Sequence, residues 1–278
     1  MRKCRWLVLL SCFLFTGCGT KFAYNNISWF AVSYIEDFVT LSNSQESELE
    51  ERLDLLQLWH KETQLPLYIS QLEVIQNTDR SNMNSAFVTE QSDQIKDHIR
   101  SIVSKFSPDI YALSMQFNPK QDNEFLKNLR EKQQEYYEER LSLNDIDSRE
   151  RYRNRIGDRL ERWLGSVSEE QKKIILAWSQ EWVNTNDSWR QYQNNTYQDL
   201  STLMEKKSDL RIAQSIIMNL LLNNEAYYPE GLEPELNKNM ETSAIFLVDI
   251  VESSNNKQWA YFMSELASLK GTFESLQE

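Results

Sequence analysis

Apolar residues recur at steps of three and four positions along almost the whole chain beyond residue 20. This spacing places them on one face of an α-helix. Six glycines and five prolines among 278 residues provide little material for the tight turns that strands need. We therefore expect an all-α protein, a multi-helix bundle of roughly eight to ten amphipathic helices. The pattern predicts helices over residues 22–39, 41–75, 84–105, 107–115, 119–141, 144–165, 169–183, 207–222, 234–251 and 259–276.

Three of these helices begin with the same local sequence: an apolar residue, a Ser or Asn, two spacers and a Gln. The three starts are residues 41–45, 117–121 and 167–171. The Ser or Asn oxygen can accept the N–H of the Gln, whose side chain can reach back to the N–H of the cap. The irregular spacing of the starts excludes a solenoid of fixed period. It leaves either an old duplication or one favourable helix start used three times.

Prolines and turn residues suggest where the helices bend or end. Pro66 removes a backbone donor inside the first long helix and predicts a kink near residues 62–65. Residues 223–234 form the clearest loop, and we expect a subdomain break there. The resulting division is a signal peptide at 1–17, a tether and aromatic helix at 18–40, a main helical domain at 41–223 and a C-terminal helical pair at 234–278.

The first eighteen residues have the order of an export signal. Three basic residues lie within the first five positions, an apolar run follows over residues 6–15, and Leu14-Phe15-Thr16-Gly17-Cys18 closes it. The run is too short to span a bilayer. The closing residues resemble the lipobox of bacterial lipoproteins, which implies cleavage before Cys18 and acylation of that cysteine. An ordinary secretory signal, a membrane anchor, or Cys12 as the modified residue are the alternatives.

Composition restricts the chemistry of the body. All three cysteines lie within the first eighteen residues, so the body beyond them has no disulfide, thiol nucleophile or thiolate metal site. The net charge is −12, and removal of the basic leader brings it to about −15. An acidic body argues against nucleic-acid binding and leaves membrane attachment to acyl chains such as palmitate. By the same lipoprotein resemblance, Gly19, in place of an Asp, favours the periplasmic face of the outer membrane.

One segment stands out against this acidic background. Arg151, Arg155, Arg159 and Arg162 share one stripe of the helix predicted at 144–165. We treat the stripe as a candidate anion-binding site for phosphate or carboxylate, as found in lipid A or peptidoglycan. The alternative is that these residues pair with the surplus acid of the same bundle.

No catalytic constellation is visible. His60 and His98 are the only histidines, too few for a usual zinc or copper site. The chain has no glycine-rich phosphate loop and no nucleophile elbow. Carboxylate pairs could still meet between helices, as in glycoside hydrolases. We predict no metal, no cofactor and no catalytic residue.

Short motifs along the chain are similar to those of an uncharacterised family of helical lipoproteins from Gram-negative proteobacteria. They are Gly17-Cys18, Ala23-Tyr24-Asn25-Asn26, Trp29, Leu58-Trp59-His60-Lys61, Leu65-Pro66, Tyr68, Ser107-Pro108-Asp109 and Glu161-Arg162-Trp163-Leu164-Gly165. The resemblance implies no activity and no site residues. The Ser-x-x-Gln starts also look, more loosely, like the Leu-Thr-x-x-Gln starts of periplasmic stress proteins of the Spy and CpxP kind.

These observations favour a non-enzymatic, lipid-anchored envelope protein. We expect a periplasmic binding or chaperone-like helical module whose partner is an envelope protein, peptidoglycan or lipid A. The alternative is a cryptic hydrolase that acts on an envelope polymer through buried carboxylates.

Overall fold

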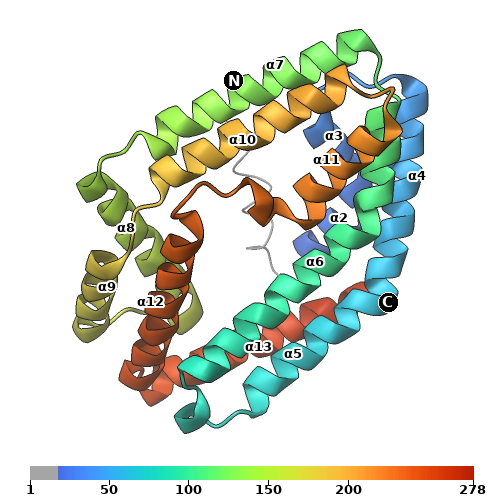
Figure 1. Ribbon diagram of the computed structural model, residues 1–278. Coiled ribbons are helices and arrows are strands. Elements are labelled where there is room, and N and C mark those ends of the chain that lie inside the picture. Colours follow the sequence, from blue (N-terminus) through green and yellow to red (C-terminus); the bar gives the residue numbers. More distant parts are fainter. Residues whose placement is uncertain (1–17) are drawn as a thin grey trace. The chain divides into compact units, whose positions relative to one another are not determined.

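The computed structural model describes residues 18–278, so the predictions for the leader lie outside the described part. All regular elements within this range are helical, and the all-α prediction is confirmed (Figure 1). None of the helices in residues 18–278 is both long and apolar enough to cross a bilayer.

Contacts divide the chain into two compact units. The first contains the residues up to Asn77 together with Ser264–Glu278, and the second is Thr78–Met263. The last helix, α13 (Asn256–Gln277), contributes to both units. The sequence-based division at residues 18–40, 41–223 and 234–278 stays a prediction, because compactness does not test which parts fold on their own.

The first unit contains the kink predicted at Pro66. It is built from α2 (Cys18–Asn25), α3 (Ile27–Glu36), α4 (Asn43–Trp59), a π-helical turn (His60–Gln64), α5 (Leu65–Asn77) and the end of α13. The π turn lies directly before the proline, where a wider turn accommodates the missing backbone donor. Helix α3 packs against α4. Leucines of α4 and α5 on the inner faces are buried: Leu49, Leu53, Leu65 and Leu72.

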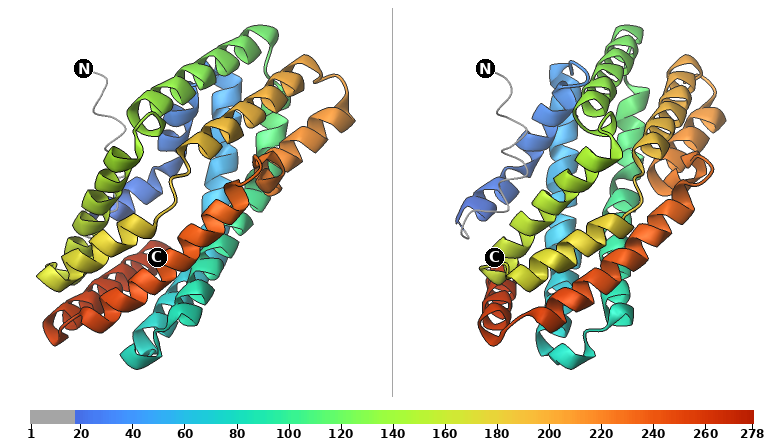
Figure 2. Two further views of the ribbon diagram at one scale, coloured as in Figure 1. Left: turned by 60° about the vertical axis from the view of Figure 1, so that its left-hand side comes forward. Right: turned by 90° about the vertical axis from the view of Figure 1, so that its left-hand side faces the viewer.

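The second unit contains most of the helices. They are α6 (Ser85–Met115), α7 (Pro119–Tyr136), a π turn (Tyr137–Leu141), α8 (Asp145–Leu164), α9 (Glu169–Glu181), α10 (Asn186–Glu205), α11 (Leu210–Leu222), α12 (Leu232–Ser253) and the first part of α13. Helix α12 packs against both α6 and α9, and α7 lies along α10 (Figures 1 and 2).

Two apolar clusters hold this unit together. Trp178 of α9 and Phe246 of α12 pack with their ring centroids 5.2 Å apart, in a cluster with Leu164, Ile175 and Ile250. The other cluster joins α10 and α11 to the end of α6 through Leu203, Ala213, Ile216 and Ile217. Burial of each large side chain contributes about 1.5–3 kcal/mol.

Two helix predictions are wrong. The pattern predicts no helix between residues 183 and 207, where the structure has α10 (Asn186–Glu205). The sequence places a break between residues 105 and 107, whereas α6 runs without interruption from Ser85 to Met115 with Pro108 inside it. Ser107 is buried, and its hydroxyl donates to the carbonyl of Val103 at 2.6 Å. This side-chain bond lies in the turn directly before the proline, which itself cannot donate to the carbonyl of Ser104.

The three predicted capping boxes are confirmed. Ser42, Asn118 and Ser168 each accept from the backbone of the third helical residue, and the Gln there accepts from the cap N–H at 2.9–3.0 Å. A fourth box that the sequence pattern missed starts α13, where Asn255 and Gln258 exchange bonds of 3.0 Å in both directions.

Two of these boxes are joined in the interior. The amide of Gln258 donates to the side-chain oxygen of Gln171 at 2.9 Å and to the carbonyl of Ser166 at 3.0 Å. Both glutamines are almost completely buried. The starts of α9 and α13 therefore meet at one hydrogen-bonded junction.

Arg80 caps the end of α12 close to this junction. Its guanidinium donates to the carbonyls of Val251 and Glu252 at 2.9 Å.

Two glycines near α8 predict opposite effects of the same substitution. Gly165 ends the helix with φ of 74°, and a Cβ there would lie 3.3 Å from the ring of Tyr261. Gly157 lies inside α8 with no atom within 4 Å of such a Cβ. We expect Gly165→Ala to lower the free energy of unfolding by about 1–2 kcal/mol and Gly157→Ala to raise it by about 0.5–1 kcal/mol. Urea unfolding measures both, and a change of the same sign in the two variants would contradict this arrangement.

Candidate functional site

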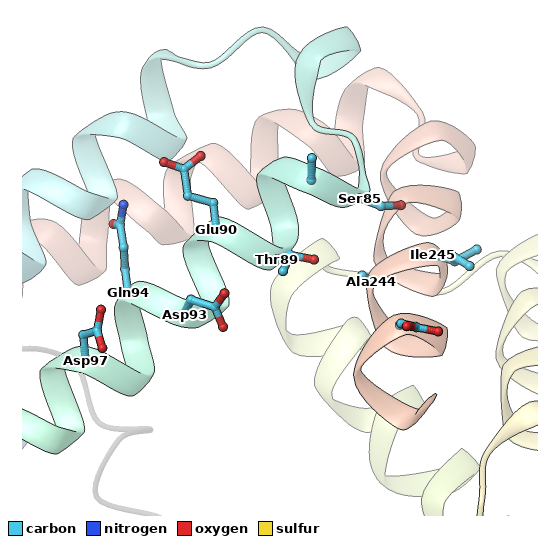
Figure 3. A pocket seen from close by; sticks show the side chains of 10 residues that line it. Ser85, Thr89, Glu90, Asp93, Gln94, Asp97, Ala244 and Ile245 are labelled. Atoms are coloured by element: carbon cyan, nitrogen blue, oxygen red, sulfur yellow. The ribbon is translucent and has the colours of Figure 1, made fainter. Parts of the chain in front are cut away.

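One hollow in the second unit lies between α6 and α12 and has a volume of about 890 Å³. Small side chains, Ala86 on α6 and Ala244 on α12, leave this space open. Figure 3 shows Glu90, Asp93 and Asp97 on successive turns of α6. The residues that line this α6–α12 groove are Ser85, Ala86, Thr89, Glu90, Asp93, Gln94, Asp97, Glu241, Ala244 and Ile245.

A second hollow of about 510 Å³ lies on the other side of α12, against α9. Its apolar lining includes Ile174, Ala177, Trp178 and Phe246, and its edge carries acidic and basic groups. Ile245 lines both hollows and is 57% exposed. Helix α12 thus presents the exposed side chain of Ile245 between the two grooves, where it is accessible for apolar contact.

The α6–α12 groove is strongly acidic. Its four carboxylates, on Glu90, Asp93, Asp97 and Glu241, are solvent-exposed, and among the described residues its lining includes no Lys or Arg. Lys96 lies beside it and pairs with Asp93 at 2.8 Å.

The first unit holds a polar chain built from motif residues. The hydroxyl of Tyr24 is hydrogen-bonded to His60 Nδ1 at 2.8 Å, and His60 Nε2 to the hydroxyl of Tyr68 at 3.2 Å. Phe273 packs on the Tyr68 ring. A neutral imidazole donates from one nitrogen and accepts at the other, so it can satisfy both hydroxyls at once.

Partial burial shifts the pKa of each member of this chain. Burial lowers the pKa of His60 and raises that of Tyr68. Burial, with a smaller contribution from Tyr68, raises the pKa of Tyr24 to about 12. All three groups are therefore held in their neutral forms. Both ring nitrogens are engaged, and no group of three or more His, Cys, Asp or Glu residues within 18–278 is arranged to hold a metal ion. These two hydrogen bonds join Tyr24 of α2 to His60 of the π turn and His60 to Tyr68 of α5.

The predicted arginine stripe lies on α8, but only two of its four arginines line the same hollow. Arg151 and Arg155 line a small hollow of about 90 Å³ between the π turn at 137–141, α8 and α10. Arg159 lies close enough to Arg155 to lower its pKa. Arg162 is near the end of α8, does not line this hollow and has other interactions. Arg140, from the π turn, joins Arg151 and Arg155 at the hollow.

Arg140 could not be found from the helical stripe. It belongs to a different helix from the stripe, and only the turn between α7 and α8 brings it to the same hollow. Cys18, the predicted lipidation site, is the first residue of α2.

Taken together, these features define an all-α protein with surface grooves and no recognisable catalytic centre among its described residues. The chain belongs to a family of unknown function, DUF6279, whose model matches residues 37–232. This match confirms that the family is uncharacterised, while the lipobox and the likeness to Spy and CpxP stay predictions. No curated protein and no solved structure matches the chain.

The Tyr24–His60–Tyr68 chain predicts a loss of stability in mild acid. Because the folded pKa of His60 is lowered, the unfolded state binds the proton more readily, and stability falls as pH drops below about 6.5. We expect His60→Phe to cost about 1–3 kcal/mol at neutral pH, since two half-buried hydroxyls lose their partner. The variant should also lose part of the pH dependence.

Urea unfolding at pH of about 7.5 and about 5.5 measures both effects. Tyr68→Phe is the control, because it removes one hydrogen bond and keeps the imidazole, so its pH dependence should persist. An unchanged pH dependence in His60→Phe would show that folding does not lower the pKa of His60.

Proposed function

We propose that this protein is a lipid-anchored envelope protein that binds a partner without catalysis. The partner is a positively charged, amphipathic segment of another envelope protein, and its binding place is the α6–α12 groove. The exposed carboxylates around the apolar floor of this groove are the observation that carries the proposal.

The chemistry of the groove selects its occupant. Ala244 and Ile245 provide apolar contact, while Glu90, Asp97 and Glu241 surround it with negative charge. A segment with Leu or Val on one face and Lys or Arg beside it matches both features, and long basic side chains can lay their stems on apolar surface. An acidic or purely polar segment would meet repulsion or would leave Ile245 exposed.

Such binding is consistent with a chaperone-like role. An unfolded chain exposes short apolar stretches next to charged residues, and shielding of these stretches slows aggregation. The alternative of a hydrolase has less support, because the four carboxylates of this groove are exposed rather than desolvated.

The proposed location at the outer membrane rests on the leader and the first helices. The lipobox-like sequence ends at Cys18, and Phe22 and Trp29 follow it with 65% and 57% of their surfaces exposed. Exposed aromatic side chains close to an acylated residue suit the membrane interface. Gly19 favours the outer membrane and its periplasmic face.

Mass spectrometry of the native protein tests the proposed lipid anchor. We expect an N-terminus at Cys18 that carries a diacylglycerol and an amide-linked acyl chain, and we expect Cys18→Ser to lack both. An intact, unacylated N-terminus at Met1, or acylation at Cys12, would contradict the proposed anchor.

Peptide binding tests the groove. The probe is a synthetic helical peptide of Leu and Lys residues, compared with the same peptide carrying Glu at each Lys position. We expect the full chain to bind the Lys peptide and not the Glu peptide. The double variant Glu90→Gln/Asp97→Asn should weaken binding about threefold to tenfold, because each exposed ion pair contributes about 0.2–1 kcal/mol.

The control variant Glu51→Gln/Asp54→Asn removes the same charge from α4, in the other unit. Equal weakening by the two double variants would mean that the peptide senses only the overall negative charge. Binding of the Glu peptide as tight as that of the Lys peptide would also contradict the proposal.

A further inference from the structure

A small basic hollow interrupts the acidic surface of the second unit. It encloses about 90 Å³, and three guanidinium groups line it, from Arg140, Arg151 and Arg155. Aromatic side chains form part of its wall: Tyr136, Tyr152 and Trp189. Three arginines around one hollow are unexpected in a protein of net charge −12.

The arginines are close enough to disfavour one another's charge. Partial burial lowers the pKa of Arg155, and the neighbouring guanidinium groups of Arg159, Arg140 and Arg151 lower it further, against the opposite influence of Tyr152. Burial also raises the pKa of the Tyr152 phenol, which the same arginines partly offset. A like-charge cluster of this kind costs free energy unless an anion joins it.

No carboxylate of the described residues forms an ion pair with Arg140, Arg151 or Arg155. Exposed acidic residues do lie beside the cluster, where Asp147, Glu150 and Asp158 share a shallow hollow with Arg151 and Arg155. Their presence limits unspecific attraction of anions, so a ligand has to enter the hollow itself to gain from the arginines.

Contacts with neighbouring groups hold the arginines in place. The Arg140 guanidinium lies over the Tyr136 ring, 5.2 Å from its centroid. Arg151 Nη1 donates to the carbonyl of Glu139 at 3.2 Å. Each guanidinium has five N–H groups, so these contacts leave most of the donors of Arg140 and Arg151 available to a ligand.

The backbone beneath the cluster is also fixed. The amide of Asn186 donates to the carbonyl of Arg140 at 3.4 Å and to the buried hydroxyl of Ser148 at 3.1 Å. Arg140 itself lies in the π-helical turn Tyr137–Leu141. This turn ends α7 directly before the link to α8. Here the π turn places Arg140 at the hollow that the α8 arginines line.

We propose that this hollow binds a phosphate group. Three guanidinium groups offer more positive charge than a single carboxylate can neutralise, whereas a phosphate carries close to two negative charges and several acceptor oxygens. The small volume suits one phosphoryl-sized group, free or at the end of a longer ligand such as a phospholipid head group. The site is separate from the α6–α12 groove and does not depend on its function.

Titration calorimetry of the full chain with inorganic phosphate tests the site. We expect Arg151→Gln/Arg155→Gln to weaken phosphate binding at least about tenfold, because the phosphate loses charge-assisted hydrogen bonds from two guanidinium groups. The control Arg153→Gln/Arg211→Gln removes two charges outside the hollow and should change the affinity less than about twofold. Melting temperatures of all variants check that they fold.

Sedimentation with phosphatidylcholine vesicles, with and without phosphatidic acid, identifies the source of the phosphate. A preference for phosphatidic acid that Arg151→Gln/Arg155→Gln abolishes assigns a lipid phosphate, and phosphate binding without that preference assigns a free one. If the protein binds neither, or if both double variants weaken binding equally, the proposal is wrong.

Discussion

The hydrogen-bonded junction between Gln171 and Gln258 joins two helix starts in the interior of the second unit. Each glutamine closes the capping box of its own helix and also reaches the other, so the starts of α9 and α13 meet in the interior. Gln171 also donates to the Ser254 hydroxyl, directly after α12. With no cysteine beyond residue 18, buried polar bonds of this kind perform the joining that disulfides perform in many exported proteins. Helix α9 begins and helix α12 ends at this junction, and these two helices line the second hollow.

Local features of the fold were predictable from the sequence. Helix starts and the Pro66 kink depend on residues within one turn of each other, and the structure contains them. The box at Asn255 escaped the pattern because Ser254, not an apolar residue, precedes it. The sequence predicts a break between residues 105 and 107, directly before Pro108, whereas α6 packs against α11 and α12 and continues through the proline.

The sites were predictable only in part, because they depend on residues far apart in the sequence. The α8 stripe gave Arg151 and Arg155, but Arg140 joins them only through the π turn, and Arg162 lies elsewhere. The acidic groove combines α6 with α12, which are about 150 residues apart, and neither helix reveals the other. The protein thus carries an acidic groove with an apolar floor and a separate basic hollow, two surfaces of opposite charge that suit different ligands.

A double-mutant cycle tests most directly whether the junction acts as one structural unit. The free energy of unfolding would be measured for the parent chain, Gln171→Ala, Gln258→Ala and the double variant. Each single replacement leaves the partner glutamine buried with one hydrogen bond fewer, so we expect a coupling energy of about 1–3 kcal/mol. Additive effects, within about 0.5 kcal/mol, would contradict the view that these two helix starts are joined through their glutamines.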